Sequence, residues 1–114
     1  MAWIAVDLDG TLAEYGELVS EYHIGKPIQP MLDRVKRWLA DGVDVRIFTA
    51  RVCEHEDVDV DTVRAHIEAW CVEHIGRVIP ITNVKDYGMV QLWDDRAVAV
   101  NPNKGDAFSF RSLL

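Results

Sequence analysis

Acidic residues occur at two places in the sequence where carboxylates could take part in chemistry. Asp7 and Asp9 lie two positions apart directly after one apolar run, and Asp94 and Asp95 directly follow another. Carboxylates that are brought together repel one another, so such a group needs a cation between its members. Oxygen ligands of this kind suit Mg²⁺, which prefers one or two carboxylates together with water and phosphate oxygens. The acids therefore predict a magnesium site if the fold brings them to one place.

Hydroxyl and basic side chains follow two further apolar runs. Thr49 comes directly after one of them, and Lys85 lies in the loop that leads to the run before the acid pair. A hydroxyl and an ammonium group are suited to hold the oxygens of a phosphoryl group, whose charge a metal ion also offsets. Arg51, two residues past Thr49, is predicted either to grip a substrate phosphate or to pair with a nearby acid. Arg96 is predicted to form a structural ion pair.

The elements that must position these residues can be predicted from apolar patterning. Short apolar runs without helical periodicity predict strands, and spacings of three to four residues predict helices. The predicted strands cover 3–6, 43–48, 78–81, 90–93 and 97–100; the predicted helices run from residue 31 to Gly42 and over 63–75, the second after the acidic loop 54–61. This order predicts a parallel sheet of about five strands with helices on both faces, a three-layer α/β/α Rossmann-like fold.

A parallel sheet would gather the candidate residues at one edge. In folds of this class ligands bind beyond the carboxyl ends of the strands. Asp7 and Asp9, Thr49, Lys85, and the pair Asp94 and Asp95 each follow a predicted strand, so all of them are expected at that edge.

Length and composition exclude several classes of protein. The chain has 114 residues, 49% of them hydrophobic, and a net charge of −7, which fits one globular domain over 1–114. No apolar run is long enough to cross a bilayer, and the first residues do not have the pattern of a secretory signal, so a soluble, cytoplasmic protein is expected. Cys53 and Cys71 cannot form a disulfide framework. The negative charge argues against a general nucleic-acid binder.

The motifs resemble those of the haloacid dehalogenase superfamily of aspartyl phosphotransferases. The matching residues occur in the order typical of that family: Asp7-Leu8-Asp9-Gly10-Thr11, then Thr49, then Lys85, then Asp94-Asp95. The segments 47–51 and 93–97 are also similar to the phosphatase domain of polynucleotide kinase and to small uncharacterised phage and bacterial relatives. The resemblance implies the same three-layer fold and a Mg²⁺-dependent phosphomonoester hydrolase.

The resemblance also implies a role for each matching residue. Asp7 would be the nucleophile that takes the phosphoryl group as an aspartyl phosphate, and Asp9 would be the general acid and base. Thr49 and Lys85 would be catalytic groups that hold the phosphate, with Arg51 and Gly10 as further phosphate-binding positions. The metal ligands would be Asp7, the backbone carbonyl of Asp9, Asp94 and Asp95. Gly10 would allow a tight turn, and Thr11 would fix the loop by local hydrogen bonds.

The spacing of the motifs leaves no room for the cap domain that such enzymes usually carry. The segments 12–26 and 52–76 are too short to hold one. An open site favours either a large substrate, such as a nucleic-acid end or a phosphoprotein, or a small one if a neighbouring subunit supplies the lid; no membrane partner is expected.

Two other interpretations are open. A receiver-like signalling module also holds a phosphorylated aspartate with acids, Thr and Lys, but its acid pair comes first in the chain. The other is a catalytically degraded member that only binds its ligand.

Overall fold

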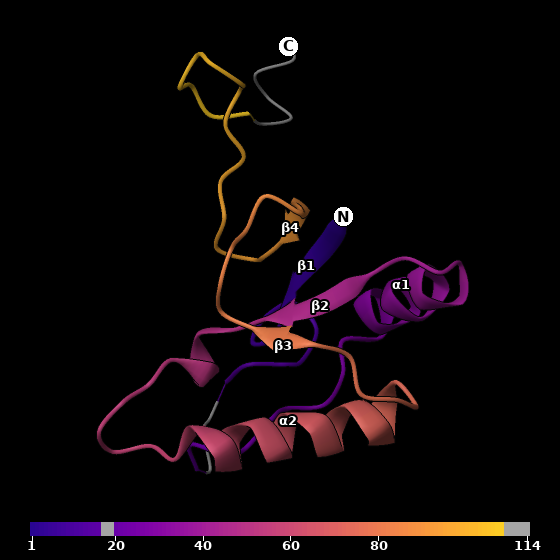
Figure 1. The fold of residues 1–114 in the computed structure, drawn as a ribbon, viewed down its shortest axis with the longest axis vertical. Helices are drawn as coiled ribbons and strands as arrows, with labels where there is room; N and C mark the ends of the chain where they lie inside the picture. Colours follow the sequence, from indigo (N-terminus) through magenta and orange to yellow (C-terminus); the bar gives the residue numbers. More distant parts are fainter. Residues whose placement is uncertain (17–19, 109–114) are drawn as a thin grey trace.

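The structure is a computed structural model that describes residues 1–16 and 20–108, in which four parallel strands form one sheet accompanied by two α-helices (Figure 1). The elements in chain order are β1 (Trp3–Asp7), α1 (Gln29–Ala40), β2 (Val45–Phe48), the short 3₁₀ helix η1 (Ala50–Val52), α2 (Val60–His74), β3 (Ile81–Thr82) and β4 (Met89–Trp93). The strand order is β3-β2-β1-β4. The predicted parallel, Rossmann-like α/β arrangement is therefore confirmed, with four strands instead of five.

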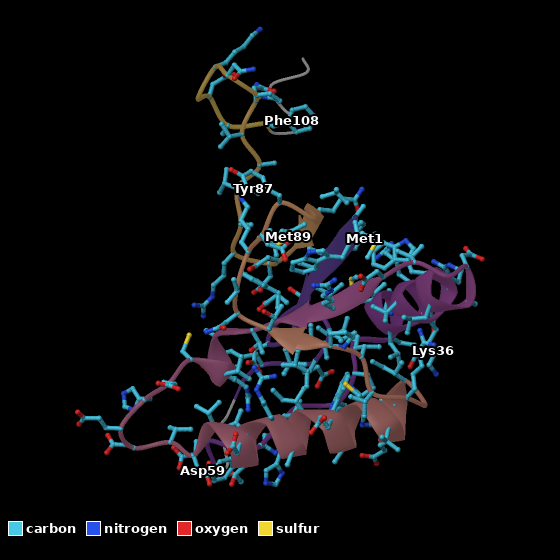
Figure 2. The ribbon with its side chains drawn as sticks, viewed as in Figure 1. Met1, Lys36, Asp59, Tyr87, Met89 and Phe108 are labelled. Carbon is cyan, nitrogen blue, oxygen red and sulfur yellow. The ribbon has the colours of Figure 1, made fainter. Side chains whose placement is uncertain are left out.

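The two helices begin and end where local chemistry allows. In α1, Pro30 lies in the first turn, where a backbone N–H has no helical partner. The chain then turns at Gly42, whose φ of 80° is a left-handed conformation that favours glycine. Asp59 precedes α2 (Figure 2). It accepts hydrogen bonds from the backbone N–H groups of Asp61 and Thr62. A hydrogen bond from the Thr62 hydroxyl, together with these backbone bonds, lowers the pKa of Asp59.

Both helices pack on the same face of the sheet. Val6, Val45 and Ile47 point to one face, because Val6 pairs with Ile47 and strand residues two apart share a face. They form a single buried cluster with Val35 of α1 and Ile67 of α2. The described residues thus form one helical layer against the sheet, and the predicted arrangement with helices on both faces is not confirmed.

The opposite face of the sheet is covered only in part, and by side chains. Trp3 is buried there, with the guanidinium of Arg46 4.5 Å from the centre of its ring and its indole N–H donating to Asp86 over 2.7 Å. Leu92, next to Ala5 in the sheet, is 37% exposed. A second helical layer would need a helix between β3 and β4, and the connection 83–88 is too short to form one.

Two predicted strands differ from the structure. The predicted strand 78–81 is shifted to β3, since Pro80 has no N–H and takes part only through its carbonyl, which accepts from Ile47 over 2.9 Å. The predicted strand 97–100 does not join the sheet. This segment instead runs away from it (yellow in Figure 1) and pairs locally, with an isolated bridge between Val100 and Ala107.

No helix within 1–16 or 20–108 has the length and apolar character needed to span a bilayer.

Candidate active site

The loop after β1 folds back tightly at the carboxyl edge of the sheet. The N–H of Gly10 donates to the carbonyl of Ala13 over 2.8 Å, and Gly10 has a φ of 88°. A β-carbon at Gly10 would lie 2.5 Å from Oδ2 of Asp95. Glycine is therefore required both by the turn, as predicted, and by the approach of the acid from β4.

Three carboxylates converge at this edge. Asp7 ends β1, Asp94 and Asp95 follow β4, and one oxygen from each lies within 4.8 Å of the others. We call these residues the three-acid cluster. Thr11 links its two sides: the hydroxyl lies 3.4 Å from Oδ2 of Asp7 and 3.3 Å from Oδ1 of Asp95, and it accepts the N–H of Asp95 over 3.0 Å. Since the hydroxyl has one proton, it can donate to only one of the two acids at a time.

The three-acid cluster carries an excess of negative charge. Burial, followed by the negative charge of Asp94 and the hydrogen bond and charge of Asp95, raises the pKa of Asp7 to about 7. No Lys or Arg side chain in the described part of the chain forms an ion pair with any of the three acids. Excess negative charge and a donor set made only of oxygen fit a hard divalent cation such as Mg²⁺.

Asp9 lies beside the three-acid cluster in a different environment. Its carboxylate accepts two hydrogen bonds from Arg51, 2.7 Å from Nε to Oδ2 and 2.8 Å from Nη2 to Oδ1. Both side chains are largely buried, with exposed fractions of 20% for Asp9 and 13% for Arg51. Of the two roles predicted for Arg51, the structure has the ion pair with an acid. Nη1 of Arg51 also donates to the carbonyl of Glu21 over 3.3 Å.

Thr49 is held rigidly at the end of β2. It is 3% exposed, its N–H donates to the carbonyl of Thr82 over 3.0 Å, and its Oγ1 accepts the N–H of Arg51 over 3.2 Å. The second contact caps η1, so the sequence after β2 fixes the rotamer of Thr49. With Oγ1 used as an acceptor, the hydroxyl proton is available to a ligand.

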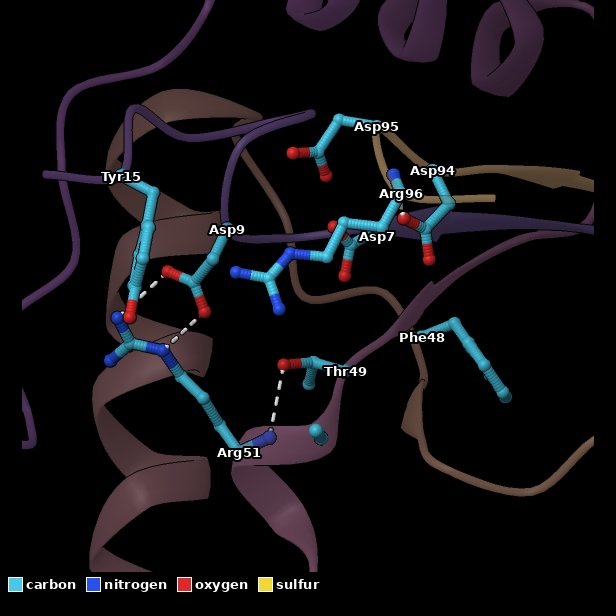
Figure 3. Close-up of a pocket in the computed structure, with 10 residues that line it drawn as sticks. Asp7, Asp9, Tyr15, Phe48, Thr49, Arg51, Asp94, Asp95 and Arg96 are labelled. Carbon is cyan, nitrogen blue, oxygen red and sulfur yellow. Dashed lines mark hydrogen bonds and ion pairs between the residues drawn. The ribbon is translucent and has the colours of Figure 1, made fainter. Parts of the chain in front are cut away.

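These groups share one hollow of about 350 Å³ (Figure 3). The residues that line it are Asp7, Asp9, Tyr15, Phe48, Thr49, Ala50, Arg51, Asp94, Asp95 and Arg96. Sequence reasoning missed Tyr15 and Phe48 as lining residues. Phe48 could have been found as the last residue of a strand that leads into the site, whereas Tyr15 comes from a loop whose path no motif indicates.

The two remaining basic residues do not lie where they were predicted. Lys85 is exposed in the loop between β3 and β4 and does not line the hollow. Arg96 was predicted to form a structural ion pair, but within the described residues no carboxylate lies within 4.0 Å of its guanidinium nitrogens, and its side chain lines the hollow instead. Both residues follow short strands through loops, where the direction of a long side chain is not encoded by strand periodicity.

Comparison with known proteins relates the chain to one solved structure. No family model and no curated protein matches the sequence. The structure of a conserved protein from Bacteroides thetaiotaomicron is similar to this chain with a TM-score of 0.59 and 21% sequence identity, over 83% of this chain and 76% of that one. At this identity the likeness shows a shared fold.

Proposed function

We propose that this chain is a Mg²⁺-dependent phosphomonoester hydrolase of the haloacid dehalogenase type, with Asp7 as the nucleophile. The observation that carries the proposal is the three-acid cluster, which shares one hollow with Asp9 and the buried hydroxyl of Thr49. The hollow thus contains a carboxylate for attack, a second carboxylate for proton transfer and a donor for phosphate oxygens.

In the first step an oxygen of Asp7 would attack phosphorus. A bond forms between Asp7 and phosphorus, the bond from phosphorus to the leaving oxygen breaks, and protonated Asp9 gives its proton to that oxygen. The product is an aspartyl phosphate and a free alcohol.

In the second step water would attack the same phosphorus. Asp9, now a carboxylate, takes a proton from the water, and the bond between phosphorus and Asp7 breaks. Inorganic phosphate leaves, and both acids return to their starting forms.

Asp7, Asp94 and Asp95 would hold Mg²⁺, with the backbone carbonyl of Asp9 as a further ligand by resemblance. When bound, Mg²⁺ offsets the charge of the acids and of the phosphoryl oxygens. Thr11 would orient Asp95 through its two contacts with that residue. Thr49 would donate its hydroxyl proton to a phosphate oxygen.

Asp9 must change partners to act as an acid. In the structure it accepts two hydrogen bonds from Arg51, so it must exchange that contact for a proton before the first step. The ion pair with Arg51 would therefore be the arrangement before the reaction, in which Asp9 is held beside the three-acid cluster as a carboxylate.

The leaving group would extend toward Asp9, since Asp9 protonates it. A second hollow of about 390 Å³ adjoins the first on this side, and Tyr15 and Arg51 line both. Its size suits a leaving group such as a sugar or nucleoside. This arrangement favours a substrate whose leaving group has a compact polar end, either a small molecule or the end of a larger one.

The test is turnover by the purified protein with and without Mg²⁺. The panel includes an aryl phosphate, sugar phosphates, nucleoside monophosphates, phosphopeptides and oligonucleotides with phosphorylated ends. We expect phosphate release that requires Mg²⁺ and stops when a chelator is added. An absence of turnover above buffer with the whole panel would overturn the proposal and leave a protein that only binds.

A further inference from the structure

We infer that Arg96 is the cation that binds the transferring phosphoryl group, the task that sequence resemblance gives to Lys85. The inference rests on the proposed phosphatase function and adds to it a substrate-binding residue that the motifs do not include. It follows from which basic groups reach the hollow and which of them are already engaged.

The position of Arg96 is set by the acid pair that precedes it. Its backbone N–H donates to Oδ1 of Asp94 over 2.8 Å, which fixes the turn after β4. From this turn the side chain of Arg96 extends into the hollow, and its guanidinium group lies between Asp9 and Thr49 in the view of Figure 3. A phosphoryl group attacked by Asp7 would have its oxygens in this part of the hollow.

Arg96 is also the available cation among the described residues that line the hollow. Arg51 lines it too, but its guanidinium group donates to Asp9 and to the carbonyl of Glu21 and borders the second hollow, on the side where the leaving group would lie. Within 1–16 and 20–108, Arg96 has no carboxylate partner within 4.0 Å. Lys85 and Arg96 are both exposed, but Arg96 lines the hollow and Lys85 does not.

The chemistry of the guanidinium group fits this task. Its planar fork can donate two parallel hydrogen bonds to two oxygens of one phosphate, and it stays charged at every working pH. The hydroxyl of Thr49 would reach a further oxygen of the same group. An ammonium group in place of the guanidinium would keep the charge and lose the fork, so Arg96→Lys should retain part of the function.

Steady-state kinetics of four variants test the inference. Arg96→Ala should lower kcat/KM by roughly 10- to 100-fold, the loss expected for one hydrogen-bonded charge, with Arg96→Lys in between. The remote surface control Arg77→Ala should stay within about twofold of the parent, and Lys85→Ala should lose less activity than Arg96→Ala. Added guanidinium ion should restore part of the activity of Arg96→Ala alone. A large loss in Lys85→Ala together with near-parental activity of Arg96→Ala would overturn the inference.

Binding of inorganic phosphate to the Mg²⁺-loaded protein separates this inference from the proposed function. Phosphate binding by the parent that is weakened at least tenfold in Arg96→Ala supports the role of Arg96 even if no panel substrate is turned over. Equal phosphate affinity in the parent and in Arg96→Ala would overturn that role even if the protein is a phosphatase. Thermal melts check the fold, and Arg96→Gln replaces Arg96→Ala if the alanine variant is destabilised.

Discussion

The hollow contains acidic residues in two different electrostatic environments. In the three-acid cluster, burial and the neighbouring carboxylates of Asp94 and Asp95 raise the pKa of Asp7 to about 7. Two residues further along the loop, Asp9 is held by a two-pronged ion pair with Arg51. Within the described residues, a basic side chain thus pairs with one of these four acids and with none of the other three. A reaction that needs a metal-bound nucleophile beside a separately held proton donor requires this division of roles.

The largest expected effect comes from removing the nucleophile. Asp7→Asn should reduce phosphatase turnover by on the order of 10⁴-fold or more, because a neutral amide cannot attack phosphorus. Release of phosphate is the measurement, and Asp57→Asn, a change of an exposed acid away from the hollow, is the matched control. Near-normal turnover by Asp7→Asn would exclude the covalent mechanism.

A smaller loss is expected from the acid paired with Arg51. Asp9→Asn should slow turnover by roughly 10²-fold, since it removes proton transfer and keeps the nucleophile. For the same reason a substrate with a good leaving group, such as an aryl phosphate, should lose less than an alkyl phosphate. Equal losses for both substrates would show that Asp9 acts through the position of Arg51 and not as an acid.

Mg²⁺ should stabilise the folded protein through the three-acid cluster alone. At a concentration about 100 times Kd, Mg²⁺ should raise the free energy of unfolding of the parent by about 2–3 kcal/mol, seen as a higher Tm at constant ionic strength. Asp95→Asn should respond hardly at all to Mg²⁺ and should be as stable as the parent or slightly more stable without it. Strong destabilisation of metal-free Asp95→Asn would mean that the hydrogen bonds to Thr11 are the main role of Asp95.

The smallest expected effect is on the pH dependence of stability without metal. The folded protein holds a proton on Asp7 up to about pH 7, whereas the unfolded chain releases it near the ordinary pKa of 3.8. Between these values the folded state binds more protons, so the free energy of unfolding should fall as pH rises from about 4 to 7. After allowance for solvent screening of this partly exposed group, the fall should be about 1–2 kcal/mol, and Asp7→Asn should remove it. Chemical denaturation at several pH values in a chelator measures it, and an unchanged slope in Asp7→Asn would assign the effect to other groups.

Strands and helices with strong patterns were predictable from the sequence. The runs that became β1, β2 and β4 and the helix that ends before Gly42 are recognisable from apolar spacing and turn chemistry, because those signals are local. The prediction of a fifth strand over 97–100 was wrong because it also relied on local signals alone. The segment 97–100 has a strand composition, but no local signal states whether a strand joins the sheet or pairs with the chain that follows it.

The candidate site was predictable where a residue ends a strand and unpredictable where it projects from a loop. Asp7, Thr49 and Asp94 follow directly from the parallel order of the strands, and all of them line the hollow. The exposed position of Lys85 and the inward direction of Arg96 depend on side-chain rotamers after a turn. Tertiary packing decides such rotamers, and spacing in the sequence does not describe it.

The indole of Trp93 lies next to the three-acid cluster in the sequence and offers a built-in spectroscopic probe for it. This residue directly precedes Asp94, its ring packs edge-on against Trp38 at 5.3 Å between centroids, and the guanidinium of Arg34 lies 4.8 Å from its ring centre. Aromatic rings in such a fixed asymmetric pair give strong near-ultraviolet circular dichroism and an emission sensitive to nearby charge. A cation bound at Asp94, as proposed, would lie one residue away from this pair. Its binding is therefore expected to change the circular dichroism or emission of Trp93, which would allow a colourless ion to be titrated without an added dye.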